Sequence, residues 1–132
     1  MVKTKGCPPE VRAGRFKKAI GFLKAADFIE AEISNDDDLA DAYVTLCIHA
    51  GIAAADVICC FYRMEYSVDP DHKQAVVLLA QVDRSSSVHL DTLVQLKTKS
   101  AYTHEHSTAA ICEKVGIAAA ELVEVANRFT TS

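Results

Sequence analysis

The chain has 132 residues, of which 50% are apolar and 24% are charged, and its formal net charge is -4. This length fits one domain with a single core and is too short for two, and the composition excludes a disordered chain. The net negative charge argues against a protein that coats nucleic acid by bulk attraction. We therefore expect one domain over residues 1–132, with residues 1–7 as a flexible N-terminal tail.

The charge is distributed unevenly along the chain. Residues 1–24 carry seven basic side chains and one acid, whereas residues 25–41 carry seven acids and no lysine or arginine. A polar helix face followed by an acidic helix start accounts for this pattern, and a partner-binding patch is the alternative.

The cysteines and the hydropathy of the chain indicate its cellular location. The five cysteines form an odd set without a C-x-x-C pair, and they are Cys7, Cys47, Cys59, Cys60 and Cys112. Such a set is typical of free thiols in a reducing compartment. The longest run without a charged residue, residues 42–55, is shorter than the roughly twenty residues of a spanning helix. No secretion signal follows the basic start. We therefore expect a cytoplasmic protein without a membrane segment.

The first two predicted helices fill the N-terminal half. Two prolines at positions 8 and 9 suit the first turn of a helix, and apolar residues then recur every three or four positions until about Ser34. Asn35 and the acids that follow it suit the start of a second helix, over residues 37–65. This helix is apolar on most sides, which is typical of a central helix.

Three further helices are predicted after residue 65. Asp69 and Pro70 begin a short helix that ends near Asp83, a serine-rich loop over residues 84–87 follows, and a fourth helix spans residues 88–101. Ser107 caps the fifth helix, which continues to about Phe129. No stretch shows the alternation of a strand. The pattern predicts an all-α, up-and-down bundle of about five helices.

Glycine and alanine near Gly51 and Gly116 permit close approach of helix backbones. Glycine inside a helix costs on the order of 1 kcal/mol relative to alanine, and close packing compensates for that cost. We therefore expect the second and fifth helices to be the most closely packed pair.

Residues 96–106 form a polar cluster just ahead of the last helix. Lys97 and Lys99 are expected on the final turns of the fourth helix, where cations suit the negative end of the helix dipole. Tyr102, His104 and His106 would occupy the bend that follows. A cation beside a group that moves protons near neutral pH is what a phosphodiester site requires. The alternative is a basic helix end followed by a solvent-exposed loop.

Asp56 and His49 are the polar exceptions in the central helix, seven residues apart and hence on the same side. A carboxylate in an apolar stretch needs a partner or must neutralise. Lys97 or Lys99 would serve if the fourth helix packs there. The alternatives are a partly exposed Asp56 and a core His49 bonded to a backbone carbonyl.

Metal and cofactor chemistry lack a complete motif. His104 and His106 could supply half of a metal site, but no other histidine or cysteine has a spacing that completes it. The sequence also lacks a glycine-rich phosphate loop. We therefore expect neither a metal nor a cofactor.

The helical organisation and the polar cluster together resemble the HEPN (higher eukaryotes and prokaryotes nucleotide-binding) domain family, an all-α bundle of four or five helices. Its active members carry R-x(4 to 6)-H near the turn of the final helical hairpin. Lys99 to His104 has the four-residue spacing, and Lys97 to His104 has the six-residue spacing. The family's arginine, which holds a phosphate with a planar fork, is lysine here. A literal match, Arg84 to His89, lies one helix earlier.

The resemblance implies two functions, and the lysine substitution leaves open whether the chain is an enzyme. We favour a HEPN-like domain that binds nucleotide, RNA or a protein partner without efficient catalysis. The alternative is a toxin-like, metal-independent endoribonuclease. In it His104 would be the general acid/base, Lys97 or Lys99 would hold the phosphate, and Tyr102 would shape the pocket.

The same resemblance bears on partners. HEPN proteins often act as homodimers whose two sites face each other, and the apolar helix surface of this chain also favours self-association. A toxin-like member would pair with a small nucleotidyltransferase. In either case Asp56 and His49 would be supporting polar residues.

Overall fold

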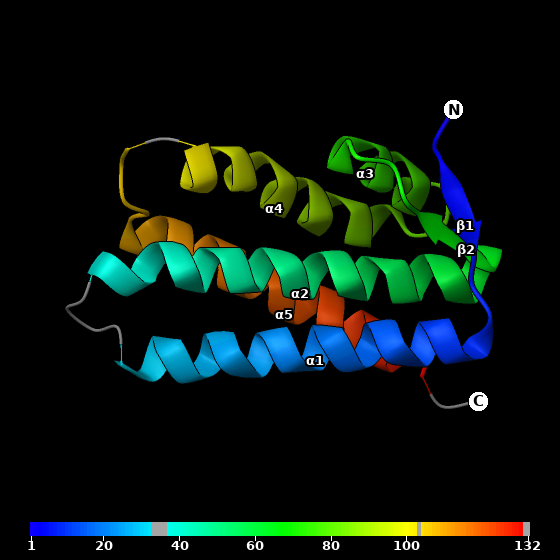
Figure 1. Ribbon diagram of the computed structural model, residues 1–132, viewed down its shortest axis with the longest axis horizontal. Helices are drawn as coiled ribbons and strands as arrows, with labels where there is room; N and C mark the ends of the chain where they lie inside the picture. Colours follow the sequence, from blue (N-terminus) through cyan, green and yellow to red (C-terminus); the bar gives the residue numbers. More distant parts are fainter. Residues whose placement is uncertain (33–36, 103, 131–132) are drawn as a thin grey trace.

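The protein is a bundle of five helices with a two-stranded sheet at one end (Figure 1). The structure is a computed structural model that describes residues 1–32, 37–102 and 104–130, without the side chains of residues 32, 37 and 98–102. The elements in chain order are β1 (Thr4–Gly6), α1 (Pro9–Glu32), α2 (Asp37–Arg63), β2 (Glu65–Ser67), α3 (His72–Ala80), α4 (Arg84–Tyr102) and α5 (Ala109–Asn127). Because 77% of the chain is helical, the predicted all-α bundle is confirmed.

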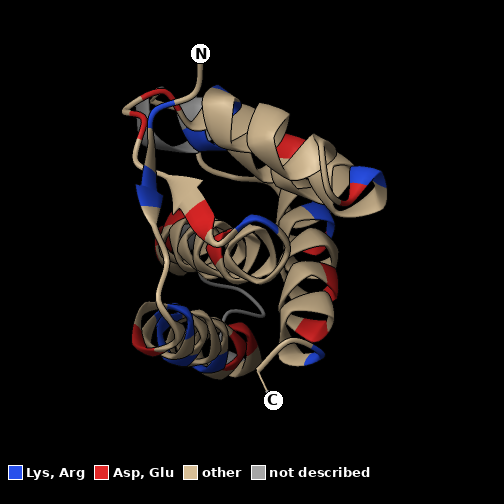
Figure 2. Ribbon diagram, turned by 90° about the vertical axis from the view of Figure 1, so that its right-hand side faces the viewer, with Lys and Arg blue, Asp and Glu red and all other residues tan. Residues whose placement is uncertain are grey.

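Helix α2 is the centre of the bundle. It packs against α1, α4 and α5, and the view along the helices in Figure 2 shows these neighbours arranged around it. Residues 53–60 are buried without a break, so this stretch has no solvent-facing side. The apolar pattern on most sides of the predicted second helix thus reflects contact with neighbours on several sides.

Two glycines admit neighbouring side chains at the helix contacts. A methyl group at Gly51 would overlap Leu93 of α4 and touch Leu122 of α5, and one at Gly116 would overlap the hydroxyl of Tyr43 on α2. The close approach of α2 and α5 is therefore confirmed. The most extensive contact of α2, however, is with α1.

The N-terminus differs from the expectation of a flexible tail over residues 1–7. Strand β1 pairs antiparallel with β2, with Lys5 opposite Tyr66, and the Cys7 amide donates to the Met64 carbonyl at 2.8 Å. Met64 has a φ of 57°, and this left-handed residue turns the chain from α2 into β2. The prediction of no strand was therefore wrong. A strand of three residues is too short to show alternation.

Three helix starts differ from the predicted ones, and at each start an aspartate or threonine side chain accepts a hydrogen bond from a backbone amide. The predicted loop at residues 84–87 is the first turn of α4, where Asp83 accepts from the amide of Ser86 at 3.2 Å and from its hydroxyl at 2.8 Å. Asp71, rather than Asp69, caps α3. Thr108, rather than Ser107, caps α5.

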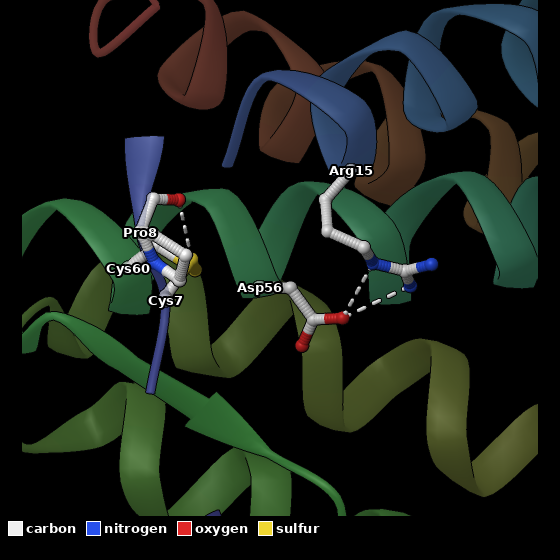
Figure 3. Close-up of a disulfide and its surroundings, with 5 residues drawn as sticks. All are labelled: Cys7, Pro8, Arg15, Asp56 and Cys60. Atoms are coloured by element: carbon white, nitrogen blue, oxygen red, sulfur yellow. Dashed lines mark hydrogen bonds and ion pairs between the residues drawn. A yellow bond between two sulfur atoms is a disulfide. The ribbon is translucent and has the colours of Figure 1, made fainter. Parts of the chain in front are cut away.

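One pair of cysteines is oxidised, contrary to the expected set of free thiols. Cys7 and Cys60 form a disulfide that ties β1 to the last turn of α2 (Figure 3). Cys47, Cys59 and Cys112 are free. Burial raises the pKa of Cys47 to about 11 and that of Cys59 to about 12, so these two thiols are not ionised near neutral pH.

One described helix, Asp38–Arg63, is long and apolar enough to cross a membrane, and 72% of its most apolar window is buried inside the bundle. The central helix of a soluble protein has the same properties, so this finding is weak evidence for a membrane segment.

Candidate functional site

A buried ion pair joins α1 to α2. Both Nε and Nη2 of Arg15 contact the same oxygen of Asp56, Oδ2, at 3.0 and 2.9 Å (Figure 3). The Asp56 side chain is 10% exposed and that of Arg15 is 28% exposed. The antiparallel packing of α1 on α2 thus supplies Arg15 as the partner of Asp56 in place of the predicted Lys97, and the side chain of the alternative, Lys99, lies outside the described residues.

The second oxygen of Asp56, Oδ1, points away from Arg15 (Figure 3). Burial raises the pKa of Asp56 to about 6, although the nearby guanidinium of Arg15 favours the ionised form. Oδ2 thus takes both the hydrogen bond from Nε and the ion-pair contact from Nη2, and no described residue donates to Oδ1.

Asp56 faces a cavity of about 340 Å³. The cavity lies where α1 and α2 meet β2 and the start of α3. Its lining combines apolar and polar side chains and consists of Arg15, Ile52, Asp56, Tyr66, Ser67, Val68, Asp69, His72 and Ala75. We call this space the acceptor cavity, because it contains two carboxylates.

A second cavity of about 470 Å³ adjoins the first one, and His72 lines both. It lies between the start of α3 and the middle of α4, and its lining residues are Pro70, Asp71, His72, Lys73, Val94, Gln95 and Lys97. We call it the lysine cavity. Both volumes fall within the range of roughly 300 to 1,000 Å³ that is usual for small-molecule sites.

Cations and histidines gather around the two cavities. The pKa of His72 is lowered by burial first, then by the charges of Lys97 and His49, and Asp71 opposes this shift. The pKa of His49 is lowered by burial, Lys97 and Arg15. Both histidines are therefore neutral at neutral pH. A bound anion would favour their protonated forms, because it would offset the neighbouring positive charges.

His49 itself is exposed, and its ring stacks on Phe22 of α1 with 5.3 Å between the ring centroids. The alternative of a core histidine bonded to a backbone carbonyl is therefore wrong.

The predicted cluster at the end of α4 divides into two parts. Lys97 is half-buried and lines the lysine cavity with His72. His104 is exposed in the loop after α4. Lys99 and Tyr102 belong to α4, but their side chains lie outside the described residues. The structure thus groups Lys97 with His49 and His72.

The loop beyond His104 is anchored to α2. Ser107 donates to Oδ1 of Asp41 from its amide at 2.9 Å and from its hydroxyl at 2.6 Å, and His106 lies 3.4 Å from the other carboxylate oxygen. Hydrogen bonds from Ser107 are the largest cause of a lowered pKa at Asp41. These contacts fix where α5 begins.

The literal R-x(4)-H match lies on the first turns of α4. Arg84 is exposed and His89 is half-buried. Residues five apart on a helix point in directions well over 100° apart, so these two side chains do not share a face.

Arg15, His72 and Lys73 are the candidate site residues that sequence reasoning missed. His72 had a visible signal, because it is the first residue of a helix capped by Asp71 and follows a proline turn. Arg15 had none: it lies 41 positions from Asp56, and only the packing of α1 brings them together.

Neither a search for metal-ligand groups nor a comparison with known proteins adds to this site. Among the described residues, no three histidine, cysteine or acidic side chains are grouped to hold a metal ion. No family model, curated protein or solved structure matches this chain, so the HEPN resemblance stays a prediction.

Proposed function

We propose that the protein binds a nucleotide, or a nucleotide unit of RNA, across the two adjoining cavities. The observation that carries this proposal is that His72 lines both cavities, one with two lysines against the single carboxylate of Asp71, the other with two carboxylates against the single guanidinium of Arg15. A nucleotide has the same polarity: an anionic phosphate at one end and hydrogen-bond donors on its sugar and base at the other.

The phosphate belongs in the lysine cavity. Lys73 and Lys97 are point charges suited to a phosphate, and His72 adds a third donor once it is protonated. The pKa of His72 is lowered first by burial and then by the positive charge of Lys97. A phosphate would relieve the repulsion between these groups, which is a source of binding free energy.

Calorimetric titration with nucleoside monophosphates and a short single-stranded RNA tests the proposal. Lys97→Met and His72→Ala should each weaken binding by about tenfold, the loss expected for one charge-assisted hydrogen bond. Lys114→Met, which removes the same charge from an exposed site on α5, is the matched control and should bind as wild type does. Equal affinities for Lys97→Met and Lys114→Met would contradict the proposal.

His104→Ala distinguishes the cavities from the loop cluster. Binding in the cavities should survive this substitution, because His104 lines neither of them. The ribonuclease alternative stays a prediction: RNA cleavage that proceeds with EDTA present and falls about a hundredfold in His104→Ala would support it. Cleavage that His104→Ala does not change would argue against it.

The homodimer, the nucleotidyltransferase partner and the cytoplasmic location also stay predictions. Sedimentation at micromolar concentration decides the first, and a monomer there would contradict it.

A further inference from the structure

The acceptor cavity contains one carboxylate oxygen that no described residue satisfies. Asp69 already uses both oxygens, since Oδ1 accepts from the amide of Asp71 at 3.0 Å and Oδ2 from that of Lys3 at 3.4 Å. Ser67 accepts from the amide of Asp69 at 3.3 Å. Oδ1 of Asp56 has no such donor among the described residues, although Asp56 is only 7% exposed.

Solvent reaches this oxygen, since no fully buried side-chain oxygen lacks a partner among the described residues, and a ligand that displaces the solvent must supply a donor in its place. An ionised carboxylate accepts hydrogen bonds and donates none, so it favours an N–H group and opposes a carbonyl oxygen at the same position. The cavity wall also offers Ile52, Val68 and Ala75 as an apolar surface for a flat ring.

We propose that Oδ1 of Asp56 determines base specificity by accepting a hydrogen bond from the exocyclic amino group of a nucleobase. This inference rests on the proposed function and adds the substrate class: nucleotides with an amino-bearing base. Arg15 is a positioning residue, because both of its contacts to Asp56 go to Oδ2 and hold the carboxylate where it lines the cavity.

Matched pairs of ligands test this contact, although the oxo member of each pair also carries an N–H group where the amino member has an acceptor at the adjacent ring nitrogen. Cytidine and uridine monophosphates carry an amino and an oxo group at the same ring position, as do adenosine and inosine monophosphates. In buffer alkaline enough to ionise Asp56, wild type should bind the amino member of each pair at least about tenfold more tightly. That ratio corresponds to one hydrogen bond to a buried charge.

Asp56→Asn and Lys97→Met should act differently. The asparagine amide can donate as well as accept, so Asp56→Asn should remove the preference between the members of each pair. Lys97→Met should weaken all four ligands by the same factor and keep the preference. This split separates a specificity residue from one that holds the phosphate.

Three outcomes decide the matter. Equal affinity of wild type for the paired ligands overturns the inference, and this test does not depend on any variant folding. A preference that persists in a folded Asp56→Asn also overturns it. If instead no nucleotide binds wild type at all, the proposed function itself has failed.

Discussion

At the scale of single residues, Asp56 is subject to two opposing influences. Burial favours its neutral form, and the guanidinium of Arg15 at 2.9 Å favours its ionised form. The first is the larger, since the pKa lies at about 6 rather than at the ordinary 3.8. Ionising Asp56 in the folded protein therefore costs free energy.

The raised pKa predicts a pH dependence of stability. Between about pH 4 and pH 6 the folded protein holds a proton on Asp56 that the unfolded chain has released. The free energy of unfolding should therefore fall as the pH rises through this window, and the contribution is fully present only below it. Urea denaturation at a series of pH values measures the slope.

Comparison with Asp56→Asn separates this contribution from those of other titrating groups. The variant should lose the fall in stability between pH 4 and 6, whereas Asp27→Asn, at an exposed position of α1, should keep it. Parallel curves for wild type and Asp56→Asn would show that burial does not control this carboxyl group.

At the scale of elements, two helical glycines should respond oppositely to alanine. Gly21 on α1 has no atom within 4 Å of a Cβ, so Gly21→Ala should raise the free energy of unfolding by roughly 1 kcal/mol through helix propensity alone. A methyl group at Gly116 would overlap the hydroxyl of Tyr43, which donates to Glu30 at 3.1 Å. Gly116→Ala should therefore cost about 1 to 3 kcal/mol.

A double-mutant cycle with Tyr43→Phe identifies the cause. If the hydroxyl is the obstacle, Gly116→Ala should cost less in the Tyr43→Phe background than in wild type. Thermal melts of the four proteins supply the comparison. An unchanged cost in both backgrounds would place the strain elsewhere on the contact between α2 and α5.

The helices were predictable from the sequence because each one carries an apolar period, but their ends were less so. Ser86 donates to Asp83 and Thr108 accepts from the amide of Ile111, and both contacts lie at helix starts. Serine and threonine are also common in loops, so composition alone does not tell a helix start from a loop. Strands β1 and β2 were missed because each has three residues and its partner lies about sixty positions away. Asp56 and Lys97 were named as candidate site residues from the sequence, yet their neighbours Arg15 and His72 come from other helices, and sequence spacing does not reveal how those helices pack.

At the scale of the whole molecule, the N-terminal segment supports the proposed site. Strand β1 pairs with β2. Just before β1, the amide of Lys3 donates a hydrogen bond to Oδ2 of Asp69 at 3.4 Å, and the carbonyl of Lys3 accepts one from the amide of Val68 at 2.9 Å. Tyr66, Val68 and Asp69 line the acceptor cavity. Basic residues lie on β1 and on the first half of α1 (Figure 2); of these segments, α1 lines the acceptor cavity through Arg15, and β1 supports it through its pairing with β2.

The disulfide between Cys7 and Cys60 closes a loop over a sequence separation of 53. Cross-linking a loop of this length restricts the unfolded chain, so Cys7→Ser should lower the free energy of unfolding by about 2 to 4 kcal/mol. Cys112→Ser removes a thiol that is already free and is the control. Denaturation with and without a dithiol reductant measures the effect: reductant should destabilise wild type and leave Cys7→Ser unchanged.

Thiol counting decides whether this cross-link exists in the cell. A cytoplasmic location predicts five free thiols, because reducing compartments keep cysteines reduced. The folded structure predicts three, at Cys47, Cys59 and Cys112. Alkylation of the unfolded protein immediately after lysis, followed by mass measurement, separates the two. Five modified thiols, together with equal stability of wild type and Cys7→Ser, would show that β1 is held by its pairing with β2 alone.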